Sequence, residues 1–371
     1  MVISMTDDTP ASRFMTRRTF FERTLAITAG ASIGGVTAAY AMPLTTAPSD
    51  PLFGSICRTA ATETVADPVG SPRHIRFAYN GTGICTAAIP VALHRGYFAK
   101  HNLDVEFLQL AGTTDQMLQA LATDKADAGA SMLLSWLKPL EQGIDVKLTT
   151  GLHGGCTRLF VPKSAGVSDI TQLKGKTIGV SSISGSPRNF FAILLAKHGV
   201  DPETEVQWRE FPADLLPTAL QRDEVQAVAD ADPTAWLIQK RSNGELVEIA
   251  SNLSEHYAHL SCCTLGIKRS LVEQDRATAA ALTAAVREGS VHVAEHPEDA
   301  AEIFSKYTPK VAVEDLLAML RSHTHDHHPT GAALRQEVAQ ITSDLKLARI
   351  VKPGTDPDKF AGRVVVDVLG G

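Results

Sequence analysis

The sequence lacks a cluster of basic residues. Its 35 Lys and Arg are outnumbered by 41 Asp and Glu, and the net charge of −6 is spread along the chain. A protein that binds nucleic acid normally carries a concentrated Lys/Arg patch on one face. We therefore exclude DNA and RNA as partners.

Motifs of several common enzyme classes are also missing. The chain contains no G-x-S-x-G nucleophile elbow, no H-E-x-x-H zinc motif and no G-x-x-x-x-G-K-[ST] phosphate loop. We therefore expect a protein that is not an enzyme and that needs no cofactor. With 371 residues, 44% of them hydrophobic, the chain can bury a stable core without help from a disulfide or a metal.

The first 41 residues are typical of an export signal. Arg17 and Arg18 precede Phe20, and an uncharged stretch rich in Ala, Gly and Thr covers 25–41 and closes on Ala-Tyr-Ala. A charged start, a short apolar region and an A-x-A site define a secretory signal, and the paired arginines resemble those of a twin-arginine (Tat) signal. The stretch is short for a bilayer span. We expect cleavage after Ala41 and a periplasmic location, in preference to a membrane anchor.

Residues 42–73 are rich in Pro, Ser, Thr and Ala without a period, which predicts a flexible leader. From residue 74, strand-like runs alternate with amphipathic stretches, the pattern of βαβ units and a parallel sheet. The expected strands are 75–79, 105–110, 126–130, 146–150, 177–180, 206–211, 227–231 and 246–250. After residue 268 only helices are expected, over 270–296, 297–307, 313–322 and 331–348.

The α/β pattern begins twice and is followed by a helical tail. The simplest fold of this kind has an inserted second lobe. We expect lobe I from residues 74–156 plus 265–371 and lobe II from 157–264, joined by a two-segment hinge near 151–161 and 257–268.

Four stretches resemble a known family. They are PVALHRGYFAKHNLDVEF from Pro90, GTTDQMLQALATDKADAGA at 112–130, DITQLKGKTIGV at 169–180 and HGVDPETEVQWREF at 198–211. Together they resemble the periplasmic solute-binding proteins of ABC importers for nitrate, sulfonates and taurine, which are related to the family that binds thiamine-pyrimidine precursors. The resemblance implies a type II periplasmic-binding-protein fold. It also implies a small-molecule ligand, an inner-membrane permease and ATPase as partners, and a monomeric protein.

The candidate ligand site follows from the geometry of α/β sheets. Ligands bind at the carboxyl ends of strands, beside helix N-termini. Glycines and hydroxyl residues at such positions expose N–H groups and suit an anion, although Ser and Thr also cap helices without binding anything. On this rule we expect ligand contacts from Gly83, Cys85, Thr113, Thr114, Ser131, Met132, Ser184, Gly185 and Ser186.

Two charged residues extend the candidate site. Asp232, close to Asp230 at the end of an expected strand, either holds an ammonium group or caps the helix that begins at Pro233. Arg188 either clamps an anion with two hydrogen bonds or is a solvated residue of a first helical turn. An anionic or zwitterionic solute is therefore expected.

The cysteines leave three interpretations open. Cys57 lies in the leader and Cys85 in the first candidate loop, while Cys156 and the pair Cys262-Cys263 lie on the two hinge segments. Cys156 forms a disulfide with one of that pair, or the thiols are buried and inert, or they form a soft-metal site with Cys85 and His153. We expect His153 among the ligand contacts and no bound metal.

The run His323-Thr324-His325-Asp326-His327-His328 also suggests metal binding. Its spacing matches no standard zinc site, so we expect a surface turn, with at most one histidine reaching the cleft.

An enzyme is the competing interpretation. Synthases of the thiamine-pyrimidine precursor share the binding-protein fold and carry a CCCFC-like motif that holds iron. Cys262-Cys263-Thr264-Leu265 resembles only a fragment of that motif, and an export signal does not suit cytoplasmic biosynthesis. A sensor that presents its ligand to a membrane kinase is a third possibility.

Overall fold

A computed structural model describes residues 70–79, 81–110 and 114–370. The expected export signal, most of the leader, Cys57 and Thr113 lie outside these residues. Within the described part of the chain, no helix has the length and apolar character needed to cross a membrane.

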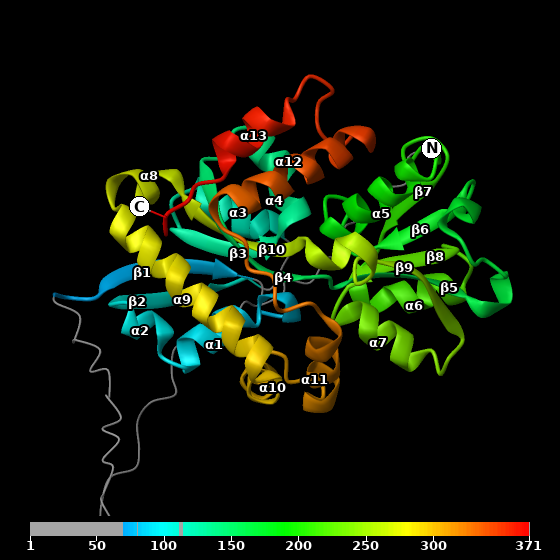
Figure 1. Cartoon of the computed structure of the whole chain (residues 1–371). Coiled ribbons are helices and arrows are strands. Elements are labelled where there is room, and N and C mark those ends of the chain that lie inside the picture. Colours follow the sequence, from blue (N-terminus) through cyan, green and yellow to red (C-terminus); the bar gives the residue numbers. More distant parts are fainter. Residues whose placement is uncertain (1–69, 80, 111–113, 371) are drawn as a thin grey trace, which may run out of the picture. The chain divides into compact units, whose positions relative to one another are not determined.

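The strands form two five-stranded sheets (Figure 1). The first has the order β2-β1-β3-β10-β4 and the second the order β7-β6-β8-β5-β9. The first sheet consists of β1 (Arg73–Tyr79), β2 (Leu103–Gln109), β3 (Ala128–Met132), β4 (Val146–Gly154) and β10 (Ser261–Lys268). The second consists of β5 (Thr157–Pro162), β6 (Thr177–Val180), β7 (Gln207–Glu210), β8 (Ala227–Ala231) and β9 (Leu246–Ser251). We call the first sheet with the helices packed on it lobe I, and the second sheet with its helices lobe II.

Both sheets are mixed: they contain the parallel pairs that the βαβ pattern predicts, together with antiparallel strands that it does not predict. β1 pairs in parallel with β2 and β3, but β10 is antiparallel to β3 and β4. In the second sheet, β5 is antiparallel to β8 and β9. The reason lies in how the chain crosses between lobes. β5 and β10 each enter a sheet directly from the other lobe, without a crossover helix, and so run against their neighbours.

These crossing strands also shorten the connections between the sheets. The regions 151–161 and 257–268, expected as hinge segments, are largely strand, and only 155–156 and 252–260 join the two sheets. β10 begins at Ser261, ahead of the lobe boundary expected at residue 264.

The helices on lobe I come from both ends of the described chain. They are α1 (Ala88–His94), α2 (Tyr97–Lys100), α3 (Thr114–Ala122), α4 (Leu133–Glu141), α8 (Arg269–Gln274), α9 (Arg276–Glu295), α10 (Pro297–Ser305), α11 (Val313–Ser322), α12 (Gly331–Leu347) and α13 (Pro357–Val364). The helix expected over 270–296 is interrupted at Asp275, whose side chain accepts from Thr278 N and caps α9. α13 was not expected.

Lobe I is covered on both faces, as the alternation of β1 requires. Ile75 and Phe77 face a core shared with Val286 of α9, whereas Ala78 faces a core shared with Trp136 of α4 and Leu345 of α12. α9 and α12 thus return the C-terminal part of the chain to the sheet that the N-terminal part began (Figure 1).

Lobe II carries α5 (Ser186–Lys197), α6 (Leu216–Gln221) and α7 (Thr234–Arg241). Its sheet has a core on each face, with Leu159 and Phe191 in one and Phe160 and Leu216 in the other. Short 3-10 turns complete the structure: η1 (Ile84–Thr86), η2 (Lys163–Ala165), η3 (Ile170–Leu173), η4 (Ala213–Leu215) and η5 (Glu255–His259).

Candidate functional site

A cavity of about 440 Å³ is lined by residues of both lobes. Lobe I contributes Thr82, Gly83, Cys85, Thr86, Thr114, Ala130, Ser131, Met132 and Ser135. Lobe II contributes Ser181, Ser182, Ser184, Gly185, Ser186, Pro187, Ala213, Asp230, Ala231, Asp232, Pro233 and Thr234. We call this space the interlobe cavity.

The cavity lies where strands end and helices begin. β3 ends at Met132 and α4 starts at the next residue; β8 ends at Ala231, just before α7. This is the edge at which open α/β sheets bind ligands.

The expected site residues fall into three groups. Nine line the cavity: Gly83, Cys85, Thr114, Ser131, Met132, Ser184, Gly185, Ser186 and Asp232. Thr113 lies outside the described residues. His153 and Arg188 are not among the lining residues.

Sequence reasoning missed several hydroxyls of the wall. Ser181 directly follows β6 and precedes the candidate loop 182–186, so the strand-end rule would have found it. Thr86 and Ser135 lie inside a 3-10 turn and a helix, and only the packing of these elements brings them to the cavity.

Two helices point uncapped N-termini at the cavity. Met132 is the N-cap residue of α4 and Gly185 that of α5, and neither supplies a side-chain cap hydrogen bond. The first N–H groups of a helix have no intrahelical partner and carry positive partial charge. The cavity therefore offers donors to an acceptor or an anion, although none of its described lining residues is Lys or Arg.

Hydroxyl contacts hold the wall together across the lobes. Ser135 Oγ and Ser186 Oγ lie 2.8 Å apart, buried between α4 and α5. Ser184 Oγ donates to Asp115 Oδ2 at 3.0 Å. Within lobe I, Thr114 Oγ1 is 2.8 Å from Ser131 Oγ. Contacts between lobes at a cavity are what a ligand-linked closure would form or break.

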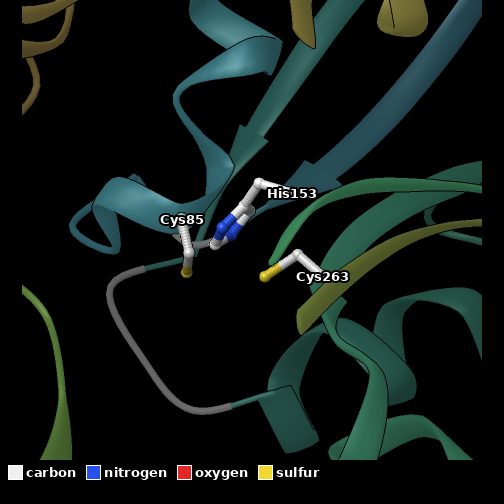
Figure 2. Close-up of side chains that lie close together, drawn as sticks. All are labelled: Cys85, His153 and Cys263. Atoms are coloured by element: carbon white, nitrogen blue, oxygen red, sulfur yellow. The ribbon is translucent and has the colours of Figure 1, made fainter. Parts of the chain in front are cut away.

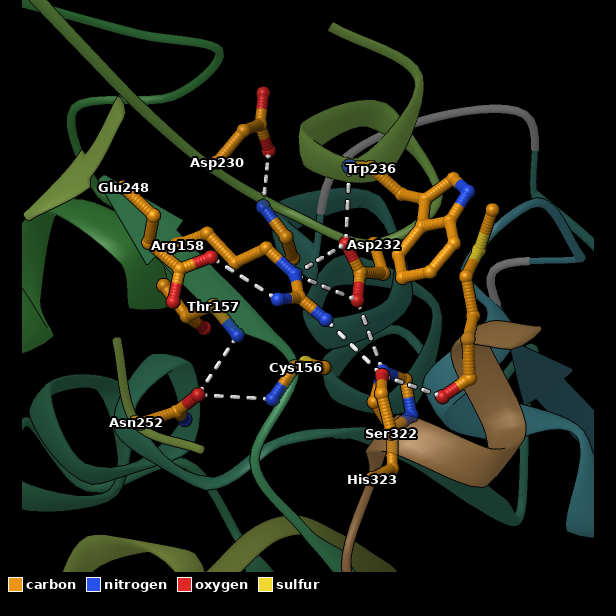
Figure 3. Close-up of polar contacts among 12 residues, drawn as sticks. Cys156, Thr157, Arg158, Asp230, Asp232, Trp236, Glu248, Asn252, Ser322 and His323 are labelled. Carbon is orange, nitrogen blue, oxygen red and sulfur yellow. Dashed lines mark hydrogen bonds and ion pairs between the residues drawn. The ribbon is translucent and has the colours of Figure 1, made fainter. Parts of the chain in front are cut away.

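Asp232 has no oxygen left for a ligand ammonium group (Figure 3). Arg158 Nε lies 3.2 Å from both carboxylate oxygens, Trp236 N donates to Oδ1 at 3.0 Å, and His323 Nε2 is 2.9 Å from Oδ2. With Asp232 only 1% exposed, its part in the structure is the helix-capping one, extended by a buried ion pair.

Arg158 is the centre of this network and was not anticipated. It extends from β5 to Glu248 Oε2 and to Ser322 Oγ, both at 3.0 Å, and its guanidinium lies over the Trp236 ring. Since Ser322 and His323 belong to lobe I, these contacts join the lobes beneath the cavity. We call Arg158, Asp232, Ser322 and His323 the interlobe network.

Asp230, two residues before Asp232 in the sequence, is not fully hydrogen-bonded. Its Oδ1 accepts from Ala231 N at 2.7 Å, while its buried Oδ2 has no hydrogen-bond partner among the described residues. Burial raises the pKa of Asp230 to about 6. The cavity wall thus contains one carboxyl group with a free oxygen.

Arg188 does not serve as an anion clamp, nor is it solvated. It is 9% exposed, pairs with Glu203 and lies with its guanidinium over the Trp208 ring. These partners are in lobe II and hold it away from the cavity.

Four cysteines and His153 meet next to the cavity. Cys85, Cys156, Cys262 and Cys263 are all buried free thiols, so none of the described cysteines forms the disulfide that the sequence left open. Cys156 Sγ and Cys262 Sγ lie 3.2 Å apart. Figure 2 shows Cys85 and Cys263 on either side of the His153 ring.

The histidine run is not a plain surface turn. Thr324 and Thr330 bridge to β4, so the segment follows that strand inward. The rings of His323 and His325 lie 5.5 Å and 5.7 Å from the ring of His153. Burial lowers the pKa of His325 to about 2, which keeps its imidazole neutral.

Comparison with known proteins agrees with this architecture. A family model described as NMT1/THI5 like matches residues 85–300. A putative thiamine biosynthesis protein of Haemophilus influenzae is 27% identical over 229 residues, covering 60% of this chain and 69% of that protein.

Solved structures show the same fold. The periplasmic aliphatic sulphonate binding protein SsuA of Escherichia coli superposes with a TM-score of 0.65 at 16% identity, over 80% of this chain and 93% of that one. The periplasmic nitrate-binding protein NrtA of Synechocystis gives 0.63 at 15% identity, over 80% and 87%. The resemblance seen in the sequence is thereby confirmed: the chain belongs to the NMT1/THI5-like family and has the two-lobed fold of periplasmic binding proteins.

Proposed function

We propose that this protein is the periplasmic substrate-binding component of an ABC importer, and that it captures a small anionic or zwitterionic solute for an inner-membrane permease and its ATPase. The observation that carries the proposal is the interlobe cavity, into which both lobes direct helix N-termini and hydroxyl groups. The family and fold support a binding role, and the N-terminal sequence supports export.

The donors of the wall favour an oxyanion group. Uncapped N–H groups of α4 and α5 and the hydroxyls of Thr114, Ser131 and Ser186 can donate to sulfonate, carboxylate or nitrate oxygens without a basic side chain. Asp230 Oδ2 can accept from an ammonium or N–H group on the same ligand. A zwitterion such as an aminosulfonate would use both, with its sulfonate accepting from the N–H and hydroxyl donors and its ammonium group donating to Asp230.

Capture by such a protein is a closure of lobes. A ligand that contacts both lobes binds the closed form more tightly and shifts the equilibrium toward it. The hydrogen bond from Ser184 to Asp115 joins the two lobes at the same interface and is formed in this structure, so opening of the lobes would break it. The closed form is then the one that the permease recognises.

The test is calorimetric titration of the purified protein with taurine, methanesulfonate, nitrate and a thiamine-precursor pyrimidine. We expect one of them to bind with 1:1 stoichiometry, and binding to be lost when Ser186→Tyr fills the cavity. Thr123→Tyr, an exposed substitution outside the cavity wall, is the matched control. Binding that survives Ser186→Tyr would place the ligand elsewhere.

A biosynthetic enzyme is the second candidate, favoured by the relative named as a putative thiamine biosynthesis protein and by the cluster of thiols beside the cavity. Mass spectrometry of each ligand after incubation with the protein separates the two. An importer component returns the ligand unchanged, whereas an enzyme releases a product.

A further inference from the structure

Five side chains with soft or nitrogen donors converge beside the interlobe cavity. Two overlapping groups, Cys85–His153–Cys263 and His153–Cys156–Cys262, each place their donor atoms within 4.8 Å of one another. All five residues are buried. They come from η1, β4, the crossing after β4, and β10, so the tertiary structure alone assembles them.

The strand register explains the arrangement. β4 and β10 are antiparallel, and Cys263 lies directly opposite His153. The register shifts on both sides of Cys263, which breaks the regular alternation of a strand. As a result Cys262 reaches Cys156 while its neighbour Cys263 reaches the His153 ring and Cys85.

His153 is oriented as a ligand. Its Nδ1 is 2.9 Å from the Gly154 carbonyl, which fixes the proton on that nitrogen. Its Nε2 is buried, on a residue only 2% exposed, and has no hydrogen-bond partner among the described residues. Metal-binding histidines typically donate one ring N–H to a carbonyl or carboxylate and bind the ion through the other nitrogen.

The crossing segment is held in place as well. Asn252 Oδ1 accepts from the backbone N–H groups of both Cys156 and Thr157, at 2.8 Å and 2.7 Å, and Asn252 Nδ2 lies 3.7 Å from Cys262 Sγ. The second group of donors is therefore positioned before any ion binds.

We propose that this cluster binds one thiophilic cation, Cu(I) or Zn(II), through Cys85, His153 and Cys263, with Cys156 and Cys262 as the adjoining thiol pair. Thiolate and imidazole donors select such ions, whereas Ca²⁺ and Mg²⁺ require oxygen ligands. The ion binds thiolates, so any thiol among these ligands that still carries its proton loses it, and binding releases protons. Cys85 also lines the interlobe cavity, which gives the ion a route inward.

The alternatives account for less. A Cys156–Cys262 disulfide would leave Cys85, His153 Nε2 and Cys263 unexplained, and inert thiols would offer the buried imidazole nitrogen only a weak S–H donor. A shared ion satisfies all three donors.

The test uses the full chain, reduced and freed of metal under anaerobic conditions. Cu(I) is titrated against a chromophoric Cu(I) chelator and Zn(II) against a zinc indicator, with proton release recorded. We expect one equivalent of one of these ions, and an affinity at least tenfold lower in His153→Gln and in Cys85→Ser. Cys57→Ser, which changes the one cysteine that lies outside the described residues, is the matched control and should bind as the parent does.

Circular dichroism shows whether each variant is folded. Because Cys85 borders the cavity, Cys85→Ser should fold even if Cys263→Ser does not. Zero equivalents of both ions in the reduced protein would overturn the proposal. So would unchanged affinity in the folded Cys85→Ser and His153→Gln proteins. Solute titrations on the metal-free protein report on the importer role separately, so failure of either proposal is recognised independently.

Discussion

The interlobe cavity and the interlobe network beneath it contain neighbouring aspartates in opposite states. Asp232 of the network has every oxygen occupied by Arg158, His323 and a backbone N–H, whereas Asp230 of the cavity wall keeps one oxygen unpaired. Both are buried at the end of the same strand. The comparison shows that the carboxylate whose oxygens are all paired joins the two lobes, whereas its neighbour in the cavity wall keeps one acceptor oxygen without a partner among the described residues.

Removing Asp232 should give the largest effect on stability. Asp232→Ala leaves the Arg158 guanidinium buried without its main partner, which costs roughly 3–5 kcal/mol. Urea unfolding monitored by fluorescence measures the loss. A change below about 1 kcal/mol would mean that the pair behaves like an exposed salt bridge and that the network does not hold the lobes.

Asp230→Asn, in contrast, should increase the stability of the folded protein. The folded-state pKa of Asp230 is about 6, above its ordinary value of 3.8. The folded protein therefore binds the proton more tightly, and its stability falls as pH rises from about 4 to about 6. Two pKa units correspond to roughly 3 kcal/mol, so the variant should be more stable than the parent by up to that amount above pH 6.

As the pH falls through 4 and below, the advantage of Asp230→Asn should disappear, because the Asp230 carboxyl becomes protonated in the unfolded protein as well as in the folded one. Thermal unfolding of the two proteins at intervals between pH 4 and pH 8 measures this. A difference that does not change with pH would contradict the assignment of a buried, unpaired carboxyl.

Placing a larger side chain in the cavity wall should weaken solute binding more than it lowers the stability of the fold. Ser184 lies on the wall and is exposed, so Ser184→Tyr obstructs the cavity without disturbing a core. We expect at least tenfold weaker solute binding, about 1.4 kcal/mol, with an unfolding midpoint within experimental error of the parent. A solute affinity equal to that of the parent would remove this loop from the site.

The smallest effect is expected at Thr114. Thr114→Val keeps the shape but removes the hydroxyl contact with Ser131, which costs about 1 kcal/mol or less because the pair is only partly buried. Chemical denaturation detects it, with Thr123→Val at an exposed position as the control. A loss of several kcal/mol in the free energy of unfolding would show that the Thr114 hydroxyl is needed for the stability of the fold, and not merely for a local contact in the cavity wall.

The local parts of the site were predictable from the sequence. Strand ends followed by Gly, Ser and Thr located Gly83, Ser131 and Ser184 at the cavity, since the carboxyl edge of a sheet is a local feature of each βα unit. Neither expectation for Arg188, an anion clamp or a solvated side chain, agrees with the structure, because its ion pair is formed with Glu203 in the loop after α5.

The partners of buried charges were not predictable. Arg158 lies in a segment expected to be a hinge. Its contact with Asp232 spans 74 positions of the sequence, and its contact with Ser322 spans 164 positions. No periodicity encodes such distances.

The sequence alone therefore determined the α/β elements, the family and the loops that line the cavity, because hydrophobic periodicity and turn residues act over a few neighbours. The tertiary structure decided which strands cross between the lobes, which aspartate is paired, and that four thiols from three other segments meet around His153. Those outcomes depend on strand register and lobe packing, which bring together residues that share no local pattern.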